Sequence, residues 1–194
     1  MRQLRALAKT RERLLRYSVS AKNALHAAVD DYFPELHEIF KSMATRSLWA
    51  ILERSPFPAD VVLMKVSFFQ ELIAKNSRKK AGSAQKARAL YQAARKSIGL
   101  KRVGDADRFR VKICLEEVKR TVLMLRDIDR QMKKIVKEMP SAPYLLSIPG
   151  IGPLSAAVYL GELGDPANFQ QLHLQVFYSF HDEDKLRSRP LKEA

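Results

Sequence analysis

The chain has 194 residues, which is enough for one sizeable hydrophobic core or for two small domains. It has a single cysteine, Cys114, so an internal disulfide is excluded and a buried thiol in a reducing compartment is expected. No segment approaches the roughly 20 apolar residues of a membrane span, and the N-terminus lacks the apolar core of a signal peptide. These features predict a soluble, cytoplasmic protein.

The net charge of +14 is concentrated in two segments. Residues 1–22 contain seven Lys or Arg and one Glu, and residues 75–102 contain ten Lys or Arg and no acid. Segments this basic attract polyanions, because each phosphate contact releases counterions, so nucleic acid is the first candidate partner. Ordinary solvated helix faces are the alternative. A basic helix on a membrane surface is disfavoured, because the first segment has few bulky apolar residues on its other face.

The first half of the chain is predicted to be helical. Apolar residues recur at helical spacing over 4–29, which predicts one long helix that Pro34 ends. Short helices are expected over 34–40 and 45–54. A longer helix, opened by a proline and buried on most sides, is expected over 59–75.

The segment 76–83 is polar and basic with one glycine, which predicts a mobile linker or an arm that becomes ordered on binding. A helix is expected over 84–98. Gly99 is expected to end it in the left-handed conformation that commonly follows a helix. The candidate DNA-binding cations of the linker are Arg78, Lys79 and Lys80.

From Asp105 to Met139, apolar positions repeat every seven residues over four heptads. This repeat predicts a coiled-coil helix with a left-handed supercoil. The partner helix is expected to be the first helix of this chain or segment 105–140 of a second copy, which would give a homodimer. An ordinary amphipathic helix packed on its own domain is the alternative. The two registers are Val111, Val118, Leu125, Met132 and Met139, and Cys114, Thr121, Ile128 and Ile135.

Two glycines flank one aliphatic residue in the run Ile148-Pro149-Gly150-Ile151-Gly152, which lies between two short helical segments. Glycines allow backbone angles and close approaches that side chains forbid, and Pro153 can open the second helix. The N–H groups at that helix start are suited to hold a phosphate oxygen. A tight helical turn without a ligand is the alternative. The candidate DNA-binding residues here are Gly150, Ile151, Gly152 and Ser155.

The string 144–160 resembles the helix-hairpin-helix module, which holds the DNA backbone without reading its sequence. Continued through Glu162-Leu163-Gly164-Asp165 to Phe169, it is similar to the start of the C-terminal domain of one transposase family. These are the DEDD (RuvC-like) insertion-sequence transposases of the IS one-ten type, also described as bridge-RNA-guided recombinases. Upstream strings such as Asp31-Tyr32-Phe33-Pro34-Glu35-Leu36 and Ser55-Pro56-Phe57-Pro58 resemble the region between the family's two catalytic domains.

The resemblance covers about residues 2–170 and implies a role in DNA transposition and recombination. It implies DNA as the first partner and a structured or guide RNA as the second. In the family, an N-terminal RuvC-like domain supplies four acids that bind a divalent metal, expected to be Mg²⁺, and a later serine is implicated as the nucleophile. This chain is expected to begin after those acids and to diverge after Phe169, so no catalytic residue, metal or cofactor is assigned to it.

The remaining polar clusters are expected to be structural or solvated. His26 and His37 are expected to be isolated residues on helices or at the surface, and the string His181-Asp182-Glu183-Asp184 to be a solvated tail. Adjacent acids such as Glu116 and Glu117 are better explained by ion pairing than by metal binding.

The expected fold is all-α, with long helices, a coiled coil and a C-terminal helix-hairpin-helix. Function is expected to be that of a DNA-binding fragment of an insertion-sequence transposase, truncated at both ends and catalytically incomplete. A coiled-coil interaction protein with no catalytic or specific nucleic-acid role is the alternative. The expected segments are a basic helical region over 1–75, a basic linker and helix over 76–104, the coiled-coil helix over 105–140, the start of the transposase domain over 141–169 and a divergent tail over 170–194.

Overall fold

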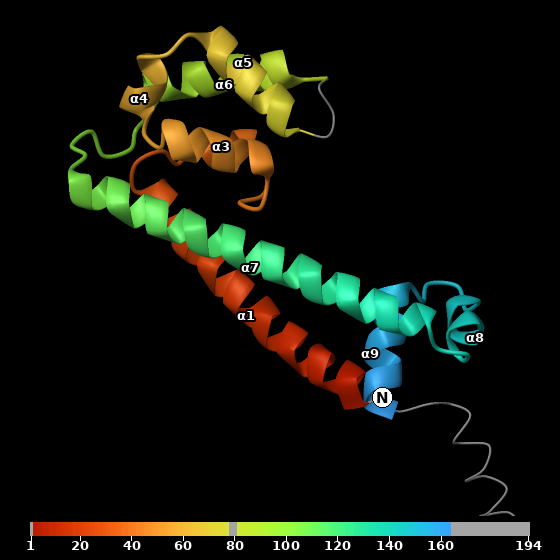
Figure 1. The fold of residues 1–194 in the computed structure, drawn as a ribbon. Helices are drawn as coiled ribbons and strands as arrows, with labels where there is room; N and C mark the ends of the chain where they lie inside the picture. The colour runs from red at the N-terminus through yellow and green to blue at the C-terminus, as the bar shows by residue number, and fades with distance from the viewer. Residues whose placement is uncertain (1, 78–80, 164–194) are drawn as a thin grey trace, which may run out of the picture. The chain divides into compact units, whose positions relative to one another are not determined.

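The computed structural model describes residues 2–77 and 81–163, and within these ranges every regular element is an α-helix (Figure 1). The predicted all-α class is confirmed. The candidate cations Arg78, Lys79 and Lys80, the end of the transposase-like string after Leu163 and the predicted tail over 170–194 lie outside the described residues. None of the helices in the described part combines the length and the apolar character that a bilayer crossing needs.

The chain forms two compact units. Unit 1 combines Met1–Glu12 with Asp127–Ala194, and unit 2 is Arg13–Arg126. Two long helices, α1 (Arg2–Asp30) and α7 (Asp105–Lys137), contribute residues to both units. The grouping differs from the consecutive segments expected from the sequence, because the first turns of α1 pack with the end of α7.

Unit 2 contains five further helices besides its parts of α1 and α7. In this unit α5 packs against α3 and α6, and α2 and α4 also pack against α6 (Figure 1). Three phenylalanines, Phe33, Phe57 and Phe69, are among the largest fully buried side chains of its core. The five helices are α2 (Leu36–Ile39), α3 (Arg46–Arg54), α4 (Pro58–Val62), α5 (Val66–Asn76) and α6 (Ser83–Lys96).

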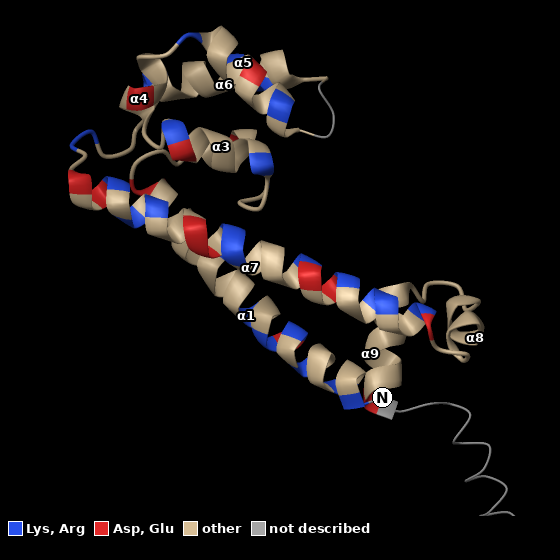
Figure 2. Cartoon of the chain, viewed as in Figure 1, with Lys and Arg blue, Asp and Glu red and all other residues tan. Residues whose placement is uncertain are grey.

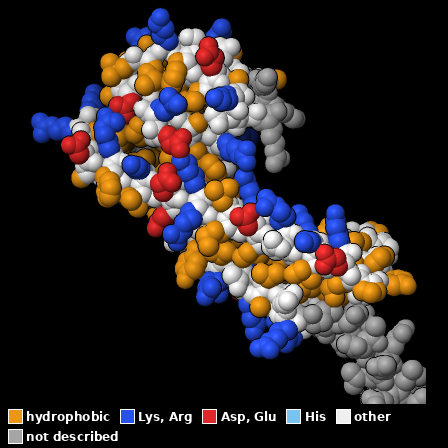
Figure 3. Space-filling view, viewed as in Figure 1, with side chains coloured by type: hydrophobic (Ala, Val, Ile, Leu, Met, Phe, Trp, Pro, Cys, Tyr) orange, Lys and Arg blue, Asp and Glu red, His pale blue; other side chains and the backbone are white. Residues whose placement is uncertain are grey.

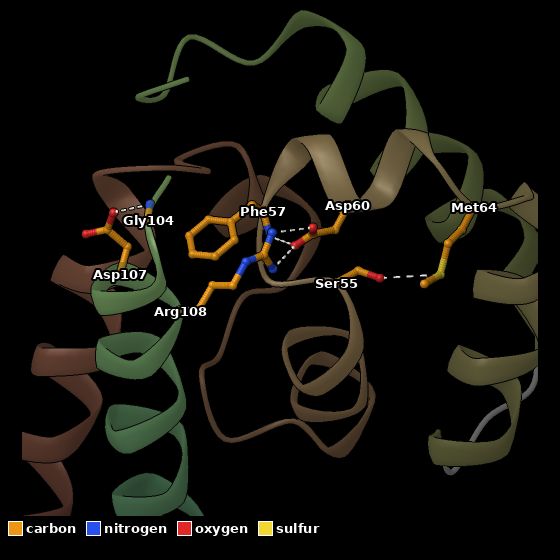
Figure 4. Close-up of polar contacts among 7 residues, drawn as sticks. All are labelled: Ser55, Phe57, Asp60, Met64, Gly104, Asp107 and Arg108. Carbon is orange, nitrogen blue, oxygen red and sulfur yellow. Dashed lines mark hydrogen bonds and ion pairs between the residues drawn. The ribbon is translucent and has the colours of Figure 1, made fainter. Parts of the chain in front are cut away.

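The prediction of a single buried helix over 59–75 is wrong, because the helix is interrupted between α4 and α5. Leu63 at the break is 85% exposed, and Lys65 adopts an extended backbone before α5 begins. The side chain of Met64 turns back toward the core, where its Sδ accepts a hydrogen bond of 3.5 Å from Ser55 Oγ (Figure 4). No Pro or Gly marks this break, so the apolar spacing alone extended the helix through it.

Gly99 does not adopt the left-handed conformation predicted for it. Among the described glycines, only Gly82 and Gly150 have a positive φ. A Cβ placed on Gly99 would lie 2.1 Å from the carbonyl oxygen of Tyr32, and the next residue, Leu100, donates its N–H to Asp31 O over 2.9 Å. Gly99 is therefore required for a close backbone approach to the end of α1.

The start of α7 is held to α4 by polar contacts. Arg108 donates two hydrogen bonds, of 2.8 and 2.9 Å, to the carboxylate of Asp60, and its guanidinium lies 5.1 Å from the ring centroid of Phe57 (Figure 4). Asp107 accepts the N–H of Gly104 over 2.8 Å, which satisfies one of the free donors at the helix start.

Several heptad positions of α7 lie in the cores of the two units, together with residues of α1. In unit 2, Val111 and Val118 share a core with Leu25 of α1, and in unit 1, Met132 shares a core with Leu4. Arg110 pairs with Asp31 in unit 2 and Arg11 pairs with Asp129 in unit 1, each over 2.7 Å. The coiled coil, its partner helix and the homodimer stay predictions.

Cys114, expected to be buried, is only partly buried in α7. Its thiol lies at the edge of the unit 2 core, and burial raises its pKa above the ordinary value. The thiolate, which is the reactive form, is therefore disfavoured at neutral pH.

Unit 1 is built from the ends of the two long helices together with α8 (Ala142–Leu146) and α9 (Pro153–Leu163). Its core residues include Leu4, Met132, Val136, Ala156, Ala157 and Leu160. Arg5 lies beside the last turn of α9, where it donates to the carbonyl oxygens of Gly161 over 3.2 Å and Glu162 over 2.6 Å. These bonds satisfy helix-end carbonyls that have no partner inside the helix.

Candidate nucleic-acid interface

A cationic pocket lies in unit 2 where the start of α3 meets α5, α6 and α7. Four exposed cations line it, namely Arg46, Lys75, Lys86 and Arg126. Among the described residues that line the pocket, none is acidic. The other lining residues are Ala44, Thr45, Ser47, Asn76 and Ser77.

The four cations of the pocket have no ion pair within the described part of the chain. Lys86 Nζ lies 5.6 Å from the ring centroid of Phe40, which is a cation–π contact and leaves the charge uncompensated. Some cations elsewhere in unit 2 are paired, as Arg108 is with Asp60 and Lys119 is with Glu53. The pocket is therefore a local concentration of positive charge.

The first turn of α3 adds backbone donors to this pocket. Thr45, the residue before the helix, has an extended backbone and makes no side-chain cap. Its hydroxyl donates instead to Ser42 O over 2.9 Å, and the first intrahelical bond runs from Trp49 N to Thr45 O over 3.1 Å. The N–H groups of the first three helical residues, beginning with Arg46, therefore have no partner inside the helix or from its cap. Helix starts of this kind favour anions.

The basic side chains of the two segments differ in their contacts. Lys75 and Lys86 of the segment 75–102 lie in the cationic pocket, whereas Arg5 and Arg11 of the segment 1–22 are held in the fold of unit 1 by α9 and Asp129. Basic side chains are spread over the face of unit 2 drawn in Figure 3, with fewer acidic ones among them. The second segment therefore keeps more of its charge available for a partner.

Sequence reasoning missed two of the four pocket cations. Arg46 and Arg126 belong to neither basic segment and are 80 positions apart, so only the tertiary structure brings them together. Arg46 could have been recognised from its local sequence. It directly follows Thr45, the expected start of a helix, and an arginine at this place is well positioned to bind an anion.

The run 148–152 forms a turn with the features of a type II β-turn. Pro149 occupies its second position, Gly150 has φ +88° at the third, and Ile151 N donates to Ile148 O over 3.1 Å. Gly150 thus has the positive φ that glycine adopts more readily than other residues. Gly152 has neither a positive φ nor a neighbouring atom within 4 Å of a built Cβ, so the expected close approach at Gly152 is not observed.

The turn leads directly into α9, which Pro153 opens as expected. Ala156 N donates to Gly152 O over 2.9 Å, so the N–H groups of Leu154 and Ser155 precede the first completed helical bond. Ser155 is exposed, and Ile151 is partly buried on the core of unit 1. Neither α8 nor α9 contains a basic residue (Figure 2), so an anion at this turn would be held by backbone donors alone.

His26 and His37, expected to be isolated, lie together in unit 2. Their rings stack with centroids 3.6 Å apart, and both rings contact the carboxylate of Asp30. These three residues form the one His, Cys, Asp and Glu grouping in the described part of the chain whose ligand atoms are close enough to share a metal ion.

No protein-family model, curated protein or solved structure matches this chain. The likeness to the insertion-sequence transposases therefore rests on the residues of the motif and remains a prediction.

Proposed function

We propose that this chain binds the phosphate backbone of nucleic acid and that the cationic pocket of unit 2 makes the main contact. The observation that carries the proposal is the meeting of four unpaired cations with an uncapped helix start. Backbone contact without base readout fits a partner recognised by charge rather than by sequence. Together with the resemblance of the motif, this favours the DNA-binding part of an insertion-sequence transposase acting on bacterial DNA in the cytoplasm.

The chemistry of the pocket suits a phosphodiester better than a carboxylate or a neutral ligand. Guanidinium groups such as those of Arg46 and Arg126 donate paired hydrogen bonds to phosphate oxygens, and ammonium groups such as that of Lys86 add mobile charge. The α3 N–H groups contribute donors whose positions are fixed, because Ser47 and Leu48 are buried in the helix start. DNA is the first partner under this proposal, and structured RNA, which presents the same phosphates, is the second.

The turn before α9 is proposed as a second, weaker contact. Gly150, Gly152 and the small Ser155 would let a phosphate approach the free N–H groups of the helix start, while Ile151 packs on the core of unit 1. Because α8 and α9 contain no cation, this contact would position and orient the nucleic acid on the protein more than it would raise the affinity for it.

The pocket is tested by removing one charge at a time. Arg46→Gln and Lys86→Gln should each weaken binding to a duplex of random sequence, measured by fluorescence anisotropy at a fixed salt concentration. The matched control is Lys112→Gln, which makes the same charge change at an exposed α7 residue outside the pocket. Equal losses in the control and the pocket variants would mean that net charge, and not the pocket, drives binding.

The homodimer through 105–140 has a weaker basis. Val111, Val118 and Met132, three of the heptad positions, are already buried in the cores of this chain. A coiled-coil interaction protein would instead need these positions for a partner. Sedimentation of the full chain separates the two functions, because the interaction protein associates through the seam whether or not nucleic acid is present.

A further inference from the structure

A cluster of three side chains with metal-binding chemistry lies at the end of α1. His26 and Asp30 are four residues apart on α1 and so face the same side of the helix, and His37 reaches the same place from α2. His26 Nδ1 lies 3.0 Å from Asp30 Oδ2, and His37 Nε2 lies 2.5 Å from Asp30 Oδ1. One ligand atom from each residue lies within 4.8 Å of the other two.

The ring nitrogen of His37 is not satisfied by this arrangement. Nε2 is buried, and although Asp30 Oδ1 is close, the oxygen is not placed to complete a hydrogen bond with the ring nitrogen. A buried polar atom without a well-formed hydrogen bond is uncommon in folded proteins, and a bound ion is one of the species that would satisfy it. The two rings lie nearly parallel, with 12° between their planes, and one nitrogen of each ring contacts the Asp30 carboxylate.

The backbone around the cluster also favours a cation. Asp30 is the last residue of α1, where the partial charge of the helix is negative, and the last turn of α1 contains no basic residue. An acid at this position is unfavourable by itself. A cation bound between Asp30 and the two imidazoles would offset both the carboxylate and the helix end.

We propose that His26, Asp30 and His37 bind one divalent transition-metal ion, of which Zn²⁺ is the representative. Imidazole nitrogens with one carboxylate suit zinc and its neighbours, whereas Mg²⁺ and Ca²⁺ prefer oxygen ligands throughout. Tetrahedral zinc with bonds of about 2.0–2.2 Å holds its ligand atoms roughly 3.3 Å apart. The exposed side chains of His26 and Asp30 can rotate toward this spacing, and the stack of the two rings must open, because each imidazole lone pair lies in the plane of its ring.

The ion would connect α1 to α2 at the surface of unit 2. α2 is four residues long and contributes one buried side chain, Leu36, so a metal clamp would add a fixed point to a short helix. Water would complete the coordination, because three protein ligands leave a position open. The proposal is independent of nucleic-acid binding, since none of these residues lines the cationic pocket.

The test is isothermal titration calorimetry of the full, tag-free chain with ZnCl₂ at pH 7.5. One Zn²⁺ per chain is expected. His26→Ala and His37→Ala should each weaken binding by more than about 100-fold, because even partners outside the coordination sphere cost about 10- to 100-fold. The matched control, His173→Ala/His181→Ala, removes the other two histidines and should bind as the wild type does. Absence of binding, or binding that only this control abolishes, would overturn the proposal.

A second measurement separates a metal from a proton. Zn²⁺ should raise the melting temperature of the wild type but not that of Asp30→Asn, and the gain should shrink as the pH falls and protons compete for the imidazoles. Circular dichroism of the variants without metal checks that they fold. A cluster that is stabilised by acid and unaffected by Zn²⁺ is an imidazolium–carboxylate pair, and that result would refute the metal site.

Discussion

Tyr32 and Asp107 form the shortest side-chain link between the end of α1 and the start of α7 in unit 2. The Tyr32 hydroxyl donates to Asp107 Oδ1 over 2.5 Å, and the ring packs edge-on against Phe57. This hydrogen bond is the main cause that raises the pKa of Tyr32, and it is also the main cause that lowers the pKa of Asp107. The N–H of Gly104 lowers the pKa of Asp107 further. The pair therefore favours a protonated phenol beside an ionised carboxylate.

The pair makes stability depend on pH in two directions. The lowered pKa of Asp107 contributes stability that is present above the ordinary carboxyl value, about 4, and is lost as the pH falls through the pKa of the folded state. The raised pKa of Tyr32 contributes stability that is present below about pH 10 and is lost as the pH rises. Tyr32→Phe should lower the melting temperature at neutral pH and reduce its fall on the alkaline side. An alkaline fall as large as that of the wild type would contradict this role.

Gly99 offers a test of the close approach to Tyr32. Gly99→Ala should lower the free energy of unfolding by about 2 kcal/mol, because the new methyl group meets a backbone carbonyl that cannot move without shifting the end of α1. The control is Gly104→Ala, whose Cβ would lie at an ordinary 3.7 Å from its nearest atom, Asp107 Oδ2. Urea denaturation of both variants measures the difference. Equal free energies of unfolding for the two variants would mean that Gly99 lies farther from the Tyr32 carbonyl than the structure shows.

At the scale of the elements, the sequence predicts helices better than it predicts their ends and neighbours. The long helices over 4–29 and 105–139 are found because their apolar spacing persists for many turns. The break at Leu63 is not predicted from the sequence, because no Pro or Gly marks it. The exposure of Leu63 results from the way in which α4 and α5 pack. Gly99 illustrates a second limit, since a glycine after a helix is compatible with either a left-handed turn or a close approach.

The turn before α9 provides a test at this scale. Gly152→Leu should leave the helix content unchanged, because a Cβ at this position meets no atom within 4 Å. If the turn contacts DNA, the added side chain should obstruct the N–H groups of Leu154 and Ser155 and lower the affinity several-fold. Circular dichroism and anisotropy on the same sample separate folding from binding. Unchanged affinity would remove the turn from the interface and leave the pocket as the contact.

At the scale of the whole molecule, the cationic pocket depends on residues that are distant in sequence. The basic segment 75–102 was predicted to bind a polyanion, but Arg46 and Arg126 join Lys75 and Lys86 only in the folded unit 2. His26 and His37, in turn, come from two helices separated by a turn. Composition indicates the class of partner in such cases, and the packing of helices decides which side chains meet.

The central claim is that phosphate groups bind at the cationic pocket, and the salt dependence of DNA affinity tests it most directly. The logarithm of the wild-type association constant should fall linearly with the logarithm of salt concentration, with a slope of about −0.9 for each phosphate contact. Replacing both Arg46 and Lys86 by Gln should reduce the size of that slope by about 2, whereas Lys112→Gln should leave it unchanged. Undetectable or salt-independent binding by the wild type, or equal slopes for all three proteins, would contradict the claim.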